Sequence, residues 1–157
     1  MLRRVVLGLL ILGVLSMTGT GCIEKTILPT VMITVAKVDP YDLVPTSTAT
    51  ADLPAVQITL DFETPVPTNL VSFSIAYQSK VGQALPELAV PPTPYEFKFT
   101  PAAGQTITIS PYTRRVVDLY DLSPSDLSPI IATIRLTFQD VNGNTLTRDA
   151  TCRLFKP

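Results

Sequence analysis

Apolar and polar residues alternate along most of the chain after residue 30, and the clearest example is the segment 56–62. Its apolar members are Val56, Ile58, Leu60 and Phe62. In an extended strand, successive side chains point to opposite faces, so a period of two residues gives one apolar face and one polar face. The pattern therefore predicts a strand over 56–62 with one face buried in a core.

The same alternation recurs in further short segments. They cover residues 31–35, 71–77, 95–99, 106–109, 115–120, 130–138 and 146–154. Turn residues such as Pro40 separate them, and the polar segment 42–54 is predicted as a loop. About seven short strands, with turns but no helical run between them, are typical of an antiparallel β-sandwich. We therefore predict an all-β sandwich domain over residues 30–157.

Proline is concentrated in residues 80–94, at Pro86, Pro91, Pro92 and Pro94. Proline has no N–H to donate to a sheet, so this segment is predicted as an edge strand or a crossing loop. Prolines at an edge also keep other chains from pairing with it. A proline-rich docking motif is the alternative interpretation.

One short helical turn is predicted after residue 30, at residues 123–127. Ser123 suits the N-cap, because its hydroxyl can accept a hydrogen bond from a free N–H of the first turn. Pro124 suits the first helical position, where a missing N–H costs nothing. We expect no other helix in this part of the chain.

The two last strands are joined by the turn residues of Asp140–Asn144. A two-residue Asn142-Gly143 turn would put the apolar residues of the two strands on opposite faces. A three-residue loop over 141–143, with Gly143 in the left-handed region, keeps them on one face. This register pairs Phe138 with Leu146, Ile134 with Ala150, Ala132 with Cys152, Ile130 with Leu154, Arg135 with Asp149, Thr137 with Thr147, and Leu136 with Arg148.

Most aromatic residues lie on the predicted apolar strand faces and are assigned to the core. They are Phe62, Phe73, Tyr77, Phe97, Phe99 and Phe138. Candidates for exposed contacts are Tyr41, Tyr112, Tyr120 and Phe155. Few aromatic residues are therefore left for a platform that stacks on sugar rings.

The first residues have the pattern of a secretory signal. Arg3 and Arg4 give a positive start, Val5–Leu15 is apolar, and small residues follow. This apolar run is shorter than the roughly 20 residues that a transmembrane helix needs. We predict a signal peptide over 1–21, and an uncleaved transmembrane anchor is the alternative.

The residues around Cys22 permit two kinds of cleavage. Gly19 and Gly21 precede it at the positions where ordinary signal peptidase requires small side chains. The stretch Thr18–Cys22 also resembles the lipobox of bacterial lipoproteins, with Gly19 where that family usually has leucine. In that family the cysteine thiol receives a diacylglycerol and the chain is cut before the cysteine.

The resemblance implies that Cys22 is the lipidation site and that residues 22–29 are a tether. Several acyl chains hold a protein firmly, at roughly 0.8 kcal/mol per buried methylene. In that family, aspartate directly after the cysteine often marks retention in the inner membrane. Because Ile23 follows here, the resemblance favours the outer membrane of the cell envelope.

The charge of the mature chain argues against nucleic acid as a partner. Loss of Arg3 and Arg4 with the signal peptide shifts the formal net charge from −1 to −3. Phosphate binding needs clustered positive charge, and the one basic cluster is Arg114-Arg115. We predict that this pair lies on a solvated strand edge.

The two cysteines, Cys22 and Cys152, do not indicate a disulfide-rich secreted fold. If Cys22 is acylated, Cys152 has no intramolecular partner. If Cys22 escapes acylation, a bridge between the two is the alternative. The neighbours of Cys152 predict a buried, unreactive thiol.

Candidate catalytic and metal sites are weak. The chain has no histidine, which excludes Ser-His-Asp and Cys-His catalysis and histidine-bound metals. Asp118, Asp121 and Asp126 could supply paired carboxylates for glycoside hydrolysis, but their spacing is not specific.

The run Asp140, Asn142, Asn144 has the spacing that opens a calcium loop. The sixth position is Thr145 instead of glycine, and the twelfth is Thr151 instead of glutamate. The hairpin turn explains these residues without a metal, so we expect no metal and no cofactor.

The strand pattern over about residues 30–157 resembles that of immunoglobulin and fibronectin type III sandwiches, without the tryptophan and paired cysteines of antibody-type domains. We expect a non-enzymatic, membrane-anchored envelope lipoprotein with a structural or protein-binding module. Its partners would be membrane lipid, through Cys22, and an envelope protein. The alternative is a secreted or anchored domain that binds carbohydrate or another ligand.

Overall fold

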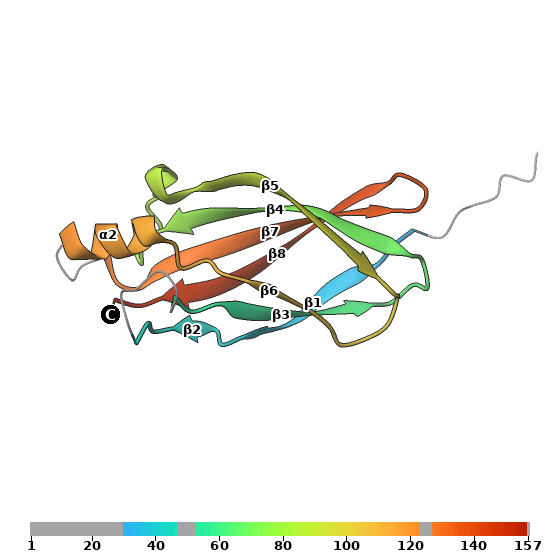
Figure 1. Ribbon diagram of the computed structural model, residues 1–157, viewed down its shortest axis with the longest axis horizontal. Helices are drawn as coiled ribbons and strands as arrows, with labels where there is room; N and C mark the ends of the chain where they lie inside the picture. The colour runs from blue at the N-terminus through green and yellow to red at the C-terminus, as the bar shows by residue number, and fades with distance from the viewer. Residues whose placement is uncertain (1–29, 47–52, 123–126, 157) are drawn as a thin grey trace, which may run out of the picture.

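The computed structural model describes residues 30–46, 53–122 and 127–156 (Figure 1). The predicted signal peptide, the tether at 22–29 and residues 123–126 of the predicted helical turn lie outside them. The described elements are β1 (Ile33–Asp39), β2 (Asp42–Leu43), β3 (Val56–Phe62), β4 (Thr68–Gln78), η2 (Pro86–Leu88), β5 (Val90–Phe99), β6 (Gln105–Ile109), α2 (Arg114–Leu122), β7 (Ile130–Asp140) and β8 (Thr145–Leu154).

The described strands form two sheets. The smaller sheet has the strand order β1-β3-β6, and the larger has the order β2-β8-β7-β4-β5. The predicted all-β, two-sheet architecture is therefore confirmed. The prediction that all strands are antiparallel is wrong, because β2 runs parallel to β8.

The short strand β2 lies inside the segment 42–54 that was predicted as a loop. The Arg153 guanidinium in β8 holds it, donating to both carboxylate oxygens of Asp42 at 2.7 Å. The side chain of Leu43 is fully buried in the core. A strand of two residues has no period of its own, so the hydrophobic pattern could not reveal it.

The two sheets share one hydrophobic core. The ring centroid of Phe99 in β5 lies 5.1 Å from that of Phe62 in the opposite sheet, and 6.1 Å from that of Phe138 in its own sheet. Each fully buried side chain of this size contributes about 1.5–3 kcal/mol to folding. The assignment of Phe97 to the core is wrong, because this side chain is 40% exposed.

The proline-rich segment contributes an edge strand, as predicted. β5 contains Pro91, Pro92 and Pro94 and is the last strand of the larger sheet. In the adjacent β4, the register shifts between Leu70 and Ser72. Leu70, and not Val71, is consequently buried in the core.

The β7–β8 hairpin confirms the three-residue loop and every predicted pair, from Phe138 opposite Leu146 to Ile130 opposite Leu154. Gly143 has a φ of +81°. Arg148, which is opposite the buried Leu136, makes a contact that the sequence did not predict. Its Nε donates to the backbone carbonyl of Ile33 in the other sheet.

The prediction of a strand at 115–120 is wrong, because these residues belong to the helix α2. Val116, Val117 and Tyr120 are buried, and their spacing places them on one helical face. The Nε of Arg114 also lies 2.9 Å from the carboxylate of Asp118, one turn further along. The expectation that no helix occurs besides 123–127 is therefore wrong as well.

Two tyrosines secure α2 against the larger sheet. The hydroxyl of Tyr120 donates to the carbonyl of Leu154 at 2.5 Å and accepts from the N–H of Ile130 at 3.0 Å. The hydroxyl of Tyr112 donates to the carbonyl of Phe155 at 2.8 Å. The prediction that Tyr112 and Tyr120 are exposed is wrong, since both are buried.

Candidate functional site

The chain enters the fold at the end opposite to α2. Ile33 at the start of β1 pairs with Phe62, and Leu60 pairs with Gln105 at the start of β6, so β1 and β6 begin at the same end. The other end of β6 leads to α2 (Figure 1). We call these the entry end and the helical end. No helix in the described part of the chain is long and apolar enough to cross a membrane.

The structure places one of the two predicted cysteines. Cys152 in β8 is free and completely buried, as its predicted position opposite Ala132 requires. Burial raises the pKa of its thiol to about 12. A thiol with this pKa forms almost no thiolate at neutral pH, so Cys152 is not a nucleophile. Cys22 lies outside the described residues.

The residues with calcium-loop spacing form the hairpin turn. Oδ1 of Asp140 accepts from the N–H groups of Asn142 and Asn144 at 2.8 and 2.9 Å, and its Oδ2 accepts from the Asn144 side chain at 2.9 Å. These hydrogen bonds lower the pKa of Asp140, and the bond from the side chain of Asn144 has the largest effect. No cluster of metal-ligating side chains occurs among the residues that the structure describes.

Of the three aspartates considered for catalysis, Asp118 and Asp121 lie on the helix α2 and not on a predicted strand or loop. Asp118 forms its ion pair with Arg114 on the surface of α2. Asp121 is exposed near the end of the same helix, and Asp126 lies outside the described residues. The predicted strand edge for Arg114-Arg115 is corrected too, because both residues lie in the first turn of α2.

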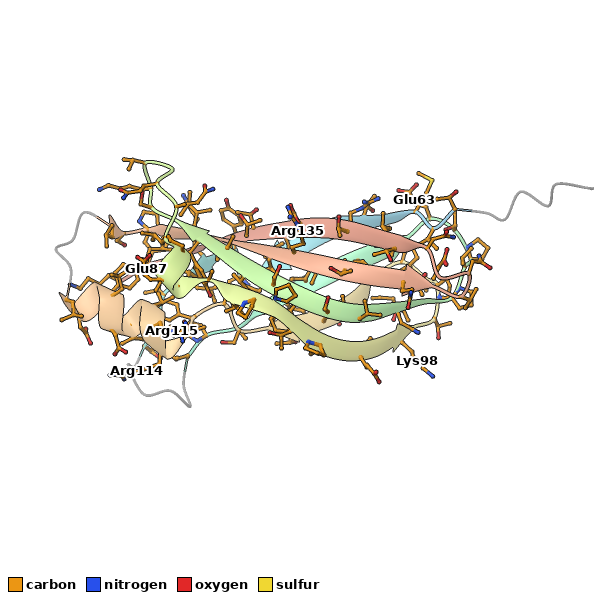
Figure 2. All side chains as sticks on the ribbon, turned by 90° about the horizontal axis from the view of Figure 1, so that it is seen from above. Glu63, Glu87, Lys98, Arg114, Arg115 and Arg135 are labelled. Atoms are coloured by element: carbon orange, nitrogen blue, oxygen red, sulfur yellow. The ribbon has the colours of Figure 1, made fainter. Side chains whose placement is uncertain are left out.

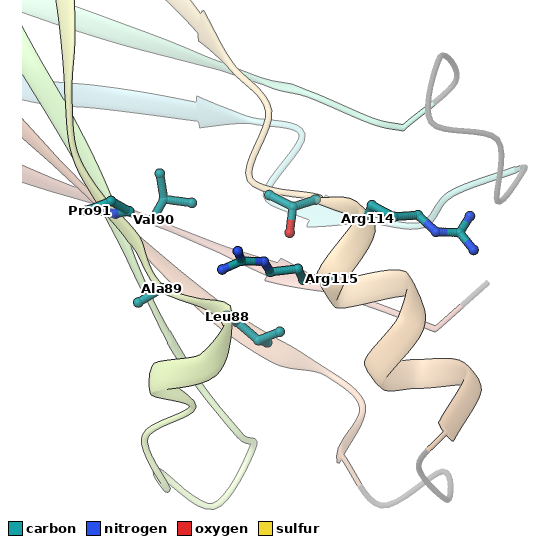
Figure 3. A pocket seen from close by; sticks show the side chains of 7 residues that line it. Leu88, Ala89, Val90, Pro91, Arg114 and Arg115 are labelled. Carbon is teal, nitrogen blue, oxygen red and sulfur yellow. The ribbon is translucent and has the colours of Figure 1, made fainter.

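A groove at the helical end is lined by η2, the start of β5 and the start of α2. Its first part has a volume of about 340 Å³, and its lining residues are Leu88, Ala89, Val90, Pro91, Thr113, Arg114 and Arg115. Figure 3 shows the Arg115 side chain reaching towards Val90 and Pro91, whereas Arg114 points away. The groove thus combines apolar walls with one guanidinium group.

The second part of this groove, about 260 Å³, continues along α2 and shares Leu88 and Arg115 with the first. It also contains Leu122, which is 85% exposed. Glu87, Arg114 and Arg115 lie together at this end of the molecule (Figure 2). Because Glu87 and Asp118 also line this second part, its surface combines apolar side chains with groups of both charges. Sequence reasoning missed it because it predicted neither η2 nor α2.

A third hollow, of about 290 Å³, lies over β4, β5 and β7 near the entry end. Its lining residues are Asn69, Leu70, Val71, Glu96, Phe97, Lys98 and Gln139. The one aromatic residue among them is Phe97, whose ring centroid lies 4.8 Å from that of the buried Phe99. A single ring packed in this way offers little surface for stacking on a sugar.

Comparison with known proteins assigns no family. No family model matches the chain, and no curated protein matches its sequence. A crystal structure of a Bordetella pertussis protein that carries the name ApaA is similar with a TM-score of 0.45 and 12% identity, covering 82% of this chain and 94% of that one.

A second solved structure is the Pseudomonas fluorescens alkylpurine DNA glycosylase AlkC, bound to DNA containing an abasic site analog. Its similarity has a TM-score of 0.37 and 19% identity, and covers 80% of this chain but 30% of the glycosylase. Neither similarity is close enough to assign an activity.

Proposed function

We propose that the chain is a membrane-anchored envelope lipoprotein whose non-catalytic β-sandwich serves as a structural or protein-binding module. The observation that carries the proposal is the separation of the chain's entry from the groove beside α2. The apolar run Val5–Leu15 and the lipobox-like Thr18–Cys22 precede the entry end. An acylated Cys22 would hold that end at the membrane and present the helical end to partners.

We also propose that the sandwich belongs to the immunoglobulin and fibronectin type III class. If β1, β3, β4, β5, β6, β7 and β8 are named A, B, C, C′, E, F and G, the sheets become ABE and GFCC′. These strands have the same neighbours in an immunoglobulin sandwich, which also has a strand D that the described residues do not form. β2 adds to strand G in parallel.

The exposed groove at the helical end favours a protein partner over a sugar. Apolar side chains such as Leu122 and Leu88 line it, together with Arg115, and large exposed apolar patches commonly mark interaction sites. None of the lining residues in either part of this groove is aromatic. The alternative, a carbohydrate- or ligand-binding domain that is secreted or anchored, has less support from these surfaces.

The anchor is tested by membrane fractionation and mass spectrometry of the N-terminal peptide. Wild-type protein should sediment with membranes and carry acyl chains on Cys22, whereas Cys22→Ala should be released and keep its fold. Cys152→Ala is the matched control, because it removes the other thiol and should leave the protein on the membrane. An unmodified Cys22 in membrane-bound or secreted wild-type protein would contradict the proposal.

A further inference from the structure

The smaller sheet ends at β6, and no strand in the described part of the chain pairs with its outer side. Its sequence, Gln-Thr-Ile-Thr-Ile, is uncharged and rich in β-branched residues. Such a strand presents unpaired backbone groups to which another chain can add.

One hydrogen bond fixes which backbone groups of β3 face which neighbour. The N–H of Glu63 donates to the carbonyl of Met32 at 2.9 Å, on one side of the Ile33–Phe62 pair. In an antiparallel ladder this makes Ile33 and Phe62 a pair whose own backbone groups point away from each other. Residues alternate along the strand, so the odd-numbered residues of β3 turn their backbone groups to β1 and the even-numbered residues turn theirs to β6.

The register between β3 and β6 shows which backbone groups of β6 face β3 and which face outward. The even-numbered residues of β3 are opposite Gln105, Ile107 and Ile109, whose backbone groups therefore face β3. The N–H and C=O groups of Thr106 and Thr108 consequently point outward. No backbone hydrogen bond to these groups occurs within the described chain.

The two edges of the larger sheet are protected against added strands. β5 carries Pro91, Pro92 and Pro94 and two register shifts. β2 is only two residues long, and its Asp42 is held by Arg153. Proline, irregular register and a very short edge are common means of preventing strand addition.

The outer edge of β1 is protected by other means. Its register shifts between Val35 and Lys37, and Lys37 and Asp39 form an ion pair of 3.0 Å. The Ile33 carbonyl faces away from β3, and Arg148 donates to it. Among the described strands, β6 alone is an edge with no proline, no charge and no register shift.

The side of the sandwich beside β6 is also incompletely covered. Arg148 joins β8 to β1, so these two strands lie on the same side of the sandwich. β6 is at the other edge of the smaller sheet and β5 is at the other edge of the larger sheet, so both lie on the opposite side. Phe97 of β5 is opposite the buried Leu70 and shares its face, yet it is 40% exposed. Phe99, two residues further along the same face, is buried against Phe62 of the smaller sheet, so the incomplete cover is local to Phe97.

We propose that the open edge of β6 is a docking site for an extended segment of a partner protein, which adds a fourth strand to the smaller sheet. The added strand would bond to the backbone of Thr106 and Thr108 and place alternate apolar side chains towards the exposed Phe97 of β5. Its other side chains would lie beside the threonine hydroxyls, where small polar residues fit.

A second copy of the chain is disfavoured as the occupant, and this step rests on the proposed lipid anchor. Pairing of two β6 strands in antiparallel orientation reverses one copy relative to the other. Because β1 and β6 begin at the same end, the entry ends of the two copies would then point in opposite directions. Two chains that both stand upright on one membrane leaflet, as the proposed presentation of the helical end requires, cannot adopt this arrangement.

The test uses the full chain in its native envelope, with the photoreactive residue benzoylphenylalanine at Thr106 as the probe. Thr108→Pro removes an outward N–H and leaves the ladder to β3 intact. We expect it to reduce the yield of the cross-linked adduct about tenfold or more. Thr108→Val keeps the N–H and the shape and should retain the adduct. If Thr108→Pro fails to unfold cooperatively, Thr108→Lys replaces it, because an edge charge also opposes strand addition.

An adduct counts as support only together with backbone protection. Hydrogen exchange at Thr106 and Thr108 should be at least about tenfold slower in the isolated complex than in the free chain. A probe at Gln57, which pairs with Thr108 but lies one strand inward, should give little adduct. Unchanged exchange, or equal adducts from Gln57 and Thr106, would overturn strand addition.

The remaining outcomes separate the edge from the anchor. An adduct of twice the chain's mass would overturn the choice of partner in favour of a second copy. Absence of an adduct in membrane-bound chain would overturn the docking site and leave the anchor intact. An adduct with backbone protection in soluble chain would support the docking site and reject the anchor.

Discussion

Arg148 in β8 donates a hydrogen bond across the sandwich to the backbone carbonyl of Ile33 in β1. The carbonyl belongs to a completely buried residue and points away from β3, so the guanidinium is the group that satisfies it. This contact joins the two sheets where the chain enters the fold. It also explains how an arginine can stand opposite the buried Leu136.

Arg148→Met should destabilise the protein by about 1–3 kcal/mol, because it leaves a buried carbonyl without a donor while keeping the apolar stem. Urea unfolding measures the change. Arg135→Met is the matched control, since Arg135 forms an exposed ion pair with Asp149 on the same hairpin at 2.9 Å. Because that pair is exposed to solvent, its loss should destabilise the protein much less. Equal losses from the two variants would refute the account of Arg148.

Gly143→Val should destabilise the hairpin by about 1 kcal/mol or more, because a β-branched residue does not tolerate positive φ. The cost arises from the backbone alone, since a Cβ at this position would meet no atom within 4 Å. Gly143→Asn is the control and should cost less, because asparagine enters the left-handed region more readily. Thermal unfolding of the three proteins gives the order, and an asparagine variant as unstable as the valine variant would contradict it.

Cys152 should react slowly with thiol reagents in the folded protein and rapidly in urea. Burial prevents access and raises the pKa of its thiol to about 12. Cys152→Ala should cost little, whereas Cys152→Asp should cost several kcal/mol, roughly the price of an unpaired buried charge. Rapid labelling of the native thiol would show that the β7–β8 face is not packed as described.

Stability should fall in acid as Asp140 becomes protonated. Its pKa in the folded state lies below the ordinary value of 3.8, chiefly because the Asn144 side chain donates to the carboxylate. A depressed pKa means that the folded state favours the ionised form, so its contribution is full above pH 3.8 and disappears as the pH falls through the folded pKa.

Unfolding in urea between about pH 2 and pH 7 measures this contribution. Asp140→Asn should be less stable than wild type at pH 7, and the difference should shrink towards pH 2. If the difference in the free energy of unfolding between the two proteins does not change with pH, the ionised carboxylate of Asp140 does not stabilise the turn.

Alternation and face consistency were sufficient to predict most strands and the whole register of the β7–β8 hairpin. The period of two is a local property, and a slip by one residue would have buried Arg135 and exposed Phe138. α2 was missed because its adjacent Val116 and Val117 fit a strand or a short helix equally well. The hydrogen bond from Tyr120 to the carbonyl of Leu154 holds this segment as a helix against the sheet. It spans 34 residues, so a local pattern cannot predict it.

The candidate surfaces could be predicted less well, because they depend on how elements meet. Phe97 alternates like a core residue, yet its side chain is 40% exposed, because burial depends on what the opposite sheet covers. The groove at Arg115 needs η2 and α2 side by side. Cys152 was predicted correctly because its position depends on one hairpin.

The attachment of α2 to Leu154 and Phe155 has a consequence for biosynthesis. The hydroxyls of Tyr120 and Tyr112 donate to the carbonyls of Leu154 and Phe155, which the ribosome adds 34 and 43 residues later. Until then the helix has neither of these hydrogen bonds. The helical end, with its groove, can therefore complete these contacts only after Leu154 and Phe155 have been synthesised, and a chain truncated before Leu154 lacks both hydrogen bonds.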